Sequence, residues 1–252
     1  MKKSFFLILF LTGLSFVFTA DKITIFIVGD STAANKDTSG GKVERGWGQM
    51  LQNFFNKKNV VIKNQALNGR SSKSFINEGH WNKVKKNLKK GNYVLIQFGH
   101  NDEKTDSALH TEPGSTFDQY LSKYAKETKQ LGGIPILMSP CARRKWSKGV
   151  LVDTHKAYRT VAKTVASKLN VLYIDGNKYT EKLETNLGEE GSKKLHMIYE
   201  PGEQPSLPNG IEDNTHYNIY GATRVAKLFA GVIVKVVPAL KPYISTNSIN
   251  LK

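Results

Sequence analysis

The ten residues FIVGDSTAAN, numbered 26 to 35, change character in the middle of the stretch. The first three continue an apolar run with the composition of a buried β-strand, and the chain then turns to Gly29-Asp30-Ser31-Thr32. Taken alone, Gly-Asp-Ser-Thr is typical of a turn or a helix N-cap, because these side chains hydrogen-bond to nearby backbone groups. Its meaning therefore depends on the residues found at the ends of the other strands.

Short apolar, β-branched runs bounded by Gly, Pro, Asn or Asp recur along the chain and alternate with helical segments. In the segment 153–170, for example, apolar residues recur every four positions, and Asp153 or Thr154 can cap its start. Strict alternation of strand and helix predicts an α/β fold with a parallel sheet of about five strands and helices on both faces. The strands are predicted at Lys22–Val28, Asn59–Asn64, Asn92–Phe98, Ile134–Ser139 and Val171–Asp175.

The N-terminus has the layout of a secretory signal peptide. Two lysines precede an apolar run at positions 5–18 that is too short to span a bilayer comfortably, and small residues follow it. We therefore expect residues 1–20 to be a signal peptide. The mature protein, residues 21–252, is expected to be one domain, exported to the periplasm or the cell exterior without stable membrane insertion. Phe18 stands where a small residue is usual at a cleavage site, which leaves an uncleaved anchor as the alternative.

The chain is strongly basic. Its formal net charge of +16 becomes +14 without Lys2 and Lys3, because 35 basic residues then face 21 acidic ones. Such a field attracts polyanions, and for an exported protein we expect acidic polysaccharide rather than nucleic acid. The lysine-rich run at 83–90 is also typical of a solvated helix face that serves solubility. The single Cys141 excludes an internal disulfide and Cys-based zinc patterns, and its apolar surroundings predict a core residue.

Polar residues follow the first three predicted strands. The carboxyl ends of parallel strands meet at one edge of the sheet, which is where such folds bind ligands. A further polar cluster precedes a helix predicted from near Asn218 toward Val237. None of these clusters is specific by itself, but together they hold the parts that acyl transfer needs. The clusters are Gly29-Asp30-Ser31-Thr32, Asn64–Ser72, Gly99-His100-Asn101-Asp102 and Asp213-Asn214-Thr215-His216.

A serine hydroxyl becomes a nucleophile when a neutral imidazole accepts its proton and a carboxylate orients that imidazole. Asp213 and His216, three residues apart, can meet within one turn of chain while the other ring nitrogen faces Ser31. The tetrahedral intermediate also needs hydrogen-bond donors. The backbone N–H groups of Ser31 and Gly69 and the side-chain amide of Asn101 lie at neighbouring strand ends and can supply them.

At these positions the sequence resembles the SGNH (GDSL-like) hydrolase superfamily. The four blocks of that superfamily match Gly29-Asp30-Ser31, Gly69, Asn101 and Asp213-x-x-His216. Further segments resemble its rhamnogalacturonan acetylesterase branch, and the similarity extends from about Ile23 to Val237. These segments are Gly46-Trp47-Gly48-Gln49, Asn68-Gly69-Arg70-Ser71-Ser72, Gln97–Asp102 and Asp213–His216.

The resemblance implies a flavodoxin-like, three-layer α/β/α sandwich with Ser31, His216 and Asp213 as a catalytic triad. It also implies an oxyanion hole from Ser31, Gly69 and Asn101, no metal or organic cofactor, and O-acetyl esters of pectin as substrate. The rhamnogalacturonan backbone of pectin carries galacturonate carboxylates, which agrees with the basic charge. One alternative is an esterase for another substrate, such as acetylated xylan, a lipid or a thioester, because a fold does not fix function. The other is a secreted polyanion-binding protein, against which the complete set of catalytic residues argues.

Substrate specificity is harder to predict. An arginine on the active edge suits a uronate carboxylate, although each arginine also fits a structural salt bridge. Trp47 has the character of either a sugar-stacking or a core residue, and Tyr217 could line the acetyl pocket or belong to the core. We interpret His100 as structural support for its loop, and leave His80, His110, His155 and His196 unassigned. The candidate substrate-binding residues are thus Arg70, Arg143, Arg144, Trp47 and Tyr217.

Overall fold

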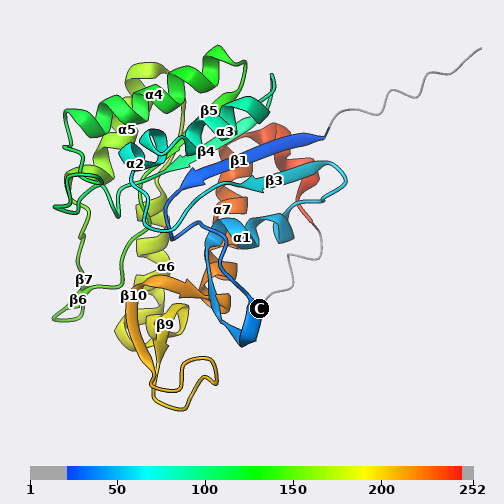
Figure 1. Ribbon diagram of the computed structural model, residues 1–252. Helices are drawn as coiled ribbons and strands as arrows, with labels where there is room; N and C mark the ends of the chain where they lie inside the picture. Colours follow the sequence, from blue (N-terminus) through cyan, green and yellow to red (C-terminus); the bar gives the residue numbers. More distant parts are fainter. Residues whose placement is uncertain (1–21, 246–252) are drawn as a thin grey trace, which may run out of the picture.

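The computed structural model describes residues 22–245, and the expected signal peptide lies outside them. Five parallel strands form a central sheet in the order β3-β1-β4-β5-β8, so β1 lies second in the sheet, with β3 on one side and the later strands added in turn on the other (Figure 1). The predicted parallel sheet of an α/β fold is therefore confirmed. The strands are β1 Ile23–Gly29, β3 Val60–Asn64, β4 Tyr93–Gln97, β5 Ile134–Met138 and β8 Leu172–Ile174.

Side chains on the two faces of β1 enter two separate cores. Ile25 and Ile27 pack under α1 (Trp47–Met50) and α7 (Ile219–Val236), and α6 (Gly176–Ser192) lies on the same side. Phe26 and Val28 point the other way, as alternation along a strand requires. Four helices cover that second face and complete the three-layer sandwich (Figure 1). They are α2 Ser72–Asn77, α3 His80–Asn87, α4 Thr116–Gln130 and α5 Ala157–Leu169.

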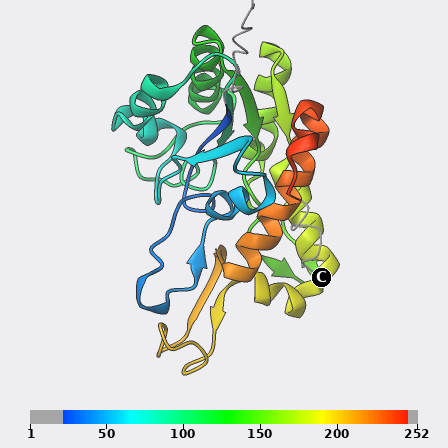
Figure 2. The same cartoon turned by 90° about the vertical axis from the view of Figure 1, so that its right-hand side faces the viewer.

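Two small sheets extend beyond the predicted architecture. One contains β2 (Glu44–Arg45), β10 (Ile211–Asn218) and β9 (His196–Tyr199), all antiparallel. The hairpin of β9 and β10 projects past the carboxyl ends of the central strands, and the segment that leads into β2 runs beside it (Figure 2). The other small sheet is the hairpin β6 Trp146–Ser147 and β7 Val150–Leu151. The sequence did not predict either sheet.

The predicted helices have the right identity and mostly the right ends. Asn218 caps α7 by accepting a hydrogen bond from the N–H of Gly221, as its place before the helix suggests. The start of α5 was predicted too early. Asp153 accepts from the N–H groups of His155 and Lys156, which forms a turn, and the helix begins at Ala157. Among residues 22–245, no helix is long and apolar enough to cross a membrane.

Candidate active site

The turn after β1 explains the Gly-Asp-Ser-Thr sequence. A side chain on Gly29 would place its Cβ 2.7 Å from the backbone oxygen of Gln97, so close pairing of β1 with β4 requires glycine. Asp30 then folds the turn, because its Oδ1 accepts from the N–H of Thr32 at 2.9 Å and from the Thr32 hydroxyl at 2.8 Å. Ser31 stands on this turn at the carboxyl edge of the sheet.

His216 and Asp213 come from strand β10, whose pairing with β9 shifts register between Asp213 and Tyr217. This irregularity lets Asp213 Oδ1 accept the backbone N–H groups of Thr215 and His216, at 2.8 and 3.0 Å. Asp213 Oδ2 lies 2.6 Å from His216 Nδ1, and His216 Nε2 lies 2.8 Å from Ser31 Oγ. The three side chains therefore form one continuous hydrogen-bonded chain from carboxylate to hydroxyl.

The carboxylate of this chain is held in its ionised form. Burial raises the pKa of Asp213, but hydrogen bonds from the ring and backbone of His216, and from the N–H of Thr215, outweigh that effect. The pKa of Asp213 therefore lies well below its usual value. An ionised Asp213 accepts a hydrogen bond from the N–H at His216 Nδ1, which leaves Nε2 as the nitrogen with a free lone pair toward Ser31.

Candidate donors for an oxyanion lie around the same cavity, which has a volume of about 500 Å³. Neither the N–H of Ser31 nor that of Gly69 donates a hydrogen bond within the described residues. Gly69 has a φ of +72°, a left-handed conformation that favours glycine. Asn101 uses one of its two amide hydrogens for the backbone oxygen of Arg70, at 3.1 Å, and keeps the other. Ser31, Gly69 and Asn101 thus bring three uncommitted N–H groups to one cavity.

Three cationic side chains also line this cavity: Lys36, Lys104 and Arg143. Lys36 bridges Glu44 at 2.6 Å and the Asn68 side chain at 2.7 Å. Arg143 is paired with Glu103. The exposed ammonium of Lys104 makes no ion pair or hydrogen bond with any residue between 22 and 245.

The sequence analysis singled out Arg143 but missed both lysines. Each lies a few residues after a strand-end motif, so closeness to Ser31 and Asn101 along the chain was the available signal.

Three predicted substrate-binding residues are corrected by the structure. Trp47 is fully buried, and its ring N–H donates to Gln97 Oε1 at 2.8 Å, so it offers no face to a sugar. Tyr217 is buried behind β10 against the ring of His196 and does not line the cavity. Arg144 is buried as well. Its guanidinium donates hydrogen bonds to the side chains of Ser192 and Asn214 and to the backbone oxygen of Glu189, so its role is structural. All three predictions of substrate contact are wrong for the same reason, burial.

Arg70 is half-exposed and pairs with Glu78 at 2.8 Å, outside the residues that line the cavity. Its substrate-binding role stays a prediction. Arg143 additionally donates to the backbone oxygen of His100 at 3.3 Å, next to Asn101 in the chain. Arg143 therefore lies where it can both face a ligand and support the loop that carries the Asn101 amide.

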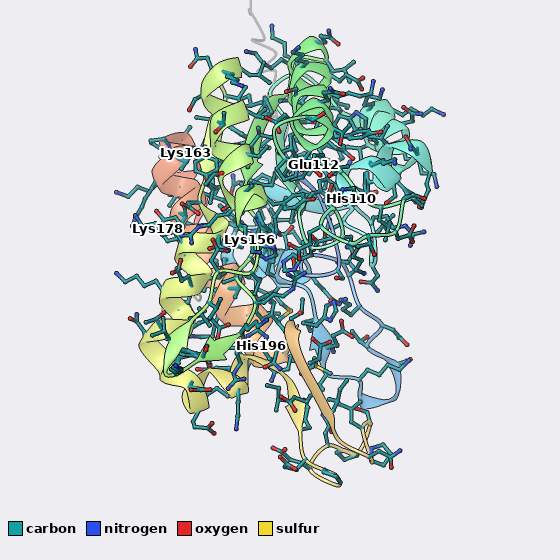
Figure 3. All side chains as sticks on the ribbon, turned by 90° about the vertical axis from the view of Figure 1, so that its left-hand side faces the viewer. His110, Glu112, Lys156, Lys163, Lys178 and His196 are labelled. Atoms are coloured by element: carbon teal, nitrogen blue, oxygen red, sulfur yellow. The ribbon has the colours of Figure 1, made fainter. Side chains whose placement is uncertain are left out.

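Two histidines other than His216, His100 and His196, have structural surroundings. His100 is buried at the cavity wall with its ring edge-on to that of His155, 4.5 Å between centroids. Burial, and then the electrostatic influence of the neighbouring His155 and Arg143, hold the pKa of His100 well below its usual value. His196, labelled in Figure 3 at the base of the β9–β10 hairpin, is buried and hydrogen-bonded to Glu184 at 2.6 Å.

The prediction that Cys141 is a core residue is confirmed, since it is fully buried.

Much of the positive charge lies away from the cavity. Lys163 and Lys178 are exposed on α5 and α6, and Lys156 is exposed just before α5 (Figure 3).

Nowhere in the range 22–245 do three His, Cys, Asp or Glu side chains come together in an arrangement that could hold a metal ion. The cavity around Ser31 itself presents a hydroxyl, an imidazole, a carboxylate and N–H donors.

A parallel α/β sandwich with Ser, His and Asp in contact at its carboxyl edge has the architecture of a serine-dependent ester hydrolase. The family model described as "GDSL-like Lipase/Acylhydrolase" matches residues 25–229, and the chain belongs to this family of SGNH hydrolases. It is accordingly a carboxylic ester hydrolase.

Two relatives align over most of the chain. Rhamnogalacturonan acetylesterase RhgT from Bacillus subtilis is 36% identical over 223 residues, which cover 88% of this chain and 94% of the relative. The rhamnogalacturonan acetylesterase of Emericella nidulans is 28% identical, with coverage of 89% and 90%. Among solved structures, protein YxiM of Bacillus subtilis superposes with a TM-score of 0.72 at 27% identity. That superposition covers 85% of this chain but 56% of YxiM, so this chain spans about half of the longer protein. The fold is shared with an acetylxylan esterase from Geobacillus stearothermophilus, which superposes with a TM-score of 0.58 at 17% identity. That superposition covers 85% of this chain and 94% of the esterase.

Proposed function

We propose that the protein removes O-acetyl groups from rhamnogalacturonan with Ser31 as nucleophile, His216 as general base and Asp213 as the group that orients the base. The observation that carries this proposal is the unbroken contact from Asp213 Oδ2 through His216 to Ser31 Oγ, at 2.6 and 2.8 Å. Both distances are within the range in which a nucleophile and its base exchange a proton.

In the first half of the reaction, Ser31 Oγ attacks the carbonyl carbon of the acetyl group while His216 Nε2 takes the hydroxyl proton. The negative charge that develops on the carbonyl oxygen is stabilised by the N–H groups of Ser31 and Gly69 and the amide of Asn101. The bond to the sugar oxygen then breaks, and the sugar leaves as an alcohol with the proton from His216. Acetyl-Ser31 remains.

The second half repeats these roles with water as nucleophile. His216 removes a proton from water as it attacks the acetyl-Ser31 carbonyl, and the same three donors stabilise the second oxyanion. Collapse of this intermediate breaks the bond to Ser31 Oγ, which recovers its proton from His216. Acetate leaves and the triad returns to its starting state.

Two observations support an acidic polysaccharide as the substrate. Two relatives that align over most of the chain, from Bacillus subtilis and Emericella nidulans, are named rhamnogalacturonan acetylesterases. Independently, the cavity around Ser31 carries Lys104 and Arg143, and the exposed ammonium of Lys104, which has no partner in the part of the chain that the structure describes, attracts a carboxylate. The acetylxylan esterase is 17% identical to this chain, which supports a shared fold only. Acetylated xylan is therefore used as the comparison substrate.

The test is acetate release from acetylated rhamnogalacturonan and from acetylated xylan, by the wild type and by Ser31→Ala. We expect release by the wild type alone and a higher kcat/KM for the acidic polymer. Equal release from both polymers would reject the substrate class and keep the triad. Turnover by purified Ser31→Ala comparable to the wild type would reject Ser31 as nucleophile.

We further propose that residues 1–20 direct export, which the sequence pattern of two lysines, a short apolar run and small residues supports. An extracellular or periplasmic location agrees with a polymer too large to enter the cell intact. Mass spectrometry of the N-terminus of protein purified from the native host tests this, and an intact Met1 on most molecules would contradict cleavage.

A further inference from the structure

A second cavity adjoins the one around Ser31. Its volume is about 350 Å³, and it shares Lys36, Glu44 and Asn68 with the first cavity as common lining residues. It lies between the segment that leads into β2 and the β9–β10 hairpin, which run side by side past the sheet edge (Figure 2). A chain-like ligand with its ester at Ser31 can therefore continue directly into this second cavity.

The lining of the second cavity combines apolar side chains with polar and charged ones. Val43, Met197, Leu207 and Ile211 contribute aliphatic side chains from both walls. Ile211 is 38% exposed although it is a large apolar residue on a strand. An exposed aliphatic group beside a catalytic cavity gains stability when an apolar part of a ligand covers it.

All charged groups in this second lining are paired. Lys36 contacts Glu44 at 2.6 Å, and Lys42 contacts Asp37 at 2.7 Å. The two lysines and two carboxylates of the lining thus neutralise one another. The cavity around Ser31 differs, because Lys104 there has no partner among the described residues. An anionic sugar is favoured at Ser31, and a neutral one in the second cavity.

Two polar groups of the second cavity have unmet hydrogen-bonding capacity. The hydroxyl oxygen of Ser206 is shielded from solvent and has no hydrogen-bond partner within residues 22–245. Asn68 accepts from Lys36 through its side-chain oxygen, and its side-chain N–H groups have no acceptor in that range. Buried polar groups normally have partners, so the shielded Ser206 hydroxyl can take one from a ligand, and the exposed amide of Asn68 is free to donate to the same ligand. Sugar hydroxyls both donate and accept, and match them.

We infer that this second cavity binds a neutral 6-deoxyhexose next to the acetylated uronic acid, with the methyl group of the deoxy sugar against Leu207 and Ile211. The inference rests on the proposed function, because a rhamnogalacturonan chain alternates a 6-deoxyhexose with a uronic acid. It adds to that function a reason for selectivity. A polymer made of uronic acids alone would bring a carboxylate, with no methyl group, into a cavity whose charges are already paired.

The test compares acetylated oligosaccharides of rhamnogalacturonan with acetylated oligosaccharides of homogalacturonan, each rate divided by the rate on p-nitrophenyl acetate. The variants are Leu207→Asn and, in case the turn at Leu207 fails to fold, Ile211→Thr, which keeps a β-branched residue on the strand. Val150→Asn is the matched control, since Val150 is 65% exposed and lies outside both cavities. We expect the ratio of kcat/KM for rhamnogalacturonan over homogalacturonan to fall about three- to tenfold in each variant, as the loss of one or two buried methyl contacts implies. An unchanged ratio in both variants would overturn the inference.

A binding measurement separates this inference from the proposed function. Titration calorimetry with deacetylated rhamnogalacturonan oligosaccharides, on the Ser31→Ala background, needs no turnover. We expect weaker binding by about three- to tenfold when Leu207→Asn is added, and no change with Val150→Asn. If the wild type hydrolyses p-nitrophenyl acetate but not acetylated rhamnogalacturonan, the proposed function fails, and this titration still decides the deoxy-sugar site. Equal affinities with and without Leu207→Asn would reject the site.

Discussion

Replacing Asp213 with asparagine tests the triad with a minimal change of shape. The new amide keeps an oxygen that accepts the backbone N–H groups of Thr215 and His216, so the turn that carries His216 is retained. Its other atom is an NH₂ group 2.6 Å from His216 Nδ1, where a carboxylate oxygen stood. Since a donor now faces Nδ1, the ring must carry its proton on Nε2 instead.

This change of tautomer alters the hydrogen bond between His216 Nε2 and Ser31 Oγ. A protonated Nε2 donates to Ser31 Oγ at 2.8 Å and can no longer accept its proton. The ionised partner that stabilises the imidazolium is lost as well. A wrong tautomer of this kind costs roughly 10⁴ in kcat in serine hydrolases, about 5 kcal/mol of transition-state stabilisation. We therefore expect kcat on p-nitrophenyl acetate to fall about 10³- to 10⁴-fold, with KM changed by less than about threefold.

The assay is initial-rate hydrolysis of p-nitrophenyl acetate, with the rate of Ser31→Ala subtracted as background. Asp153→Asn is the control, because Asp153 also accepts backbone N–H groups but lies outside the cavity. Circular dichroism and a thermal melt establish that each variant is folded. A kcat for Asp213→Asn within about tenfold of the wild type would refute the argument from the tautomer.

Three further outcomes are expected. Asn101→Ala removes one oxyanion donor and should lower kcat about 10²- to 10³-fold. It should also reduce stability modestly, because the hydrogen bond to the Arg70 backbone is lost. An unchanged kcat on p-nitrophenyl acetate would contradict the role of Asn101. Lys104→Gln should raise KM for acetylated rhamnogalacturonan about two- to fivefold at low salt and much less at about 1 M salt. The control Lys163→Gln on α5 should leave KM unchanged at both salt concentrations. An effect of Lys104→Gln on KM that persists at high salt would exclude an electrostatic cause. Glu127→Gln should lower the free energy of unfolding by about 1–2 kcal/mol at pH 7, measured by urea denaturation. Burial raises the pKa of Glu127, but hydrogen bonds from Lys123, Lys85 and Trp81 outweigh it and bring that pKa from 4.5 to about 2. Because the folded state holds the ionised form, this contribution is complete above pH 4.5 and is lost as pH falls toward 2, so the wild type and variant should converge in that window.

The central sheet could be predicted because most residues of its inner strands β1, β4 and β5 are buried on both faces. Such strands are short, continuous apolar runs, and each predicted run differs from its strand by one or two residues at the ends. The sheet of β2, β9 and β10 lacked that signal. Strand β10 carries Glu212, Asp213 and Asn214 in succession, without an apolar alternation, because this strand serves the active site and bends at a bulge.

The contact of Ser31, His216 and Asp213 could be predicted because these residue types have few other reasons to converge. The directions of neighbouring side chains could not. Tyr217 follows His216 in a strand, so its side chain points to the opposite side and enters the core. Arg143 faces the cavity while Arg144 is buried behind it. Adjacency in sequence to a catalytic residue therefore says little about adjacency to substrate.

The proposed nucleophile and its proposed base are held by different sheets. Ser31 is anchored at the end of β1 in the central sheet, whereas His216 and Asp213 are carried by β10 in the small antiparallel one. A local displacement of the β9–β10 hairpin would therefore separate Ser31 Oγ from His216 Nε2, and it would disturb the core only where Tyr217 packs. Local opening of this kind requires less free energy than global unfolding. On heating, catalysis should consequently cease at a lower temperature than the one at which helical ellipticity disappears, and the interval between the two would report how firmly the two sheets are joined.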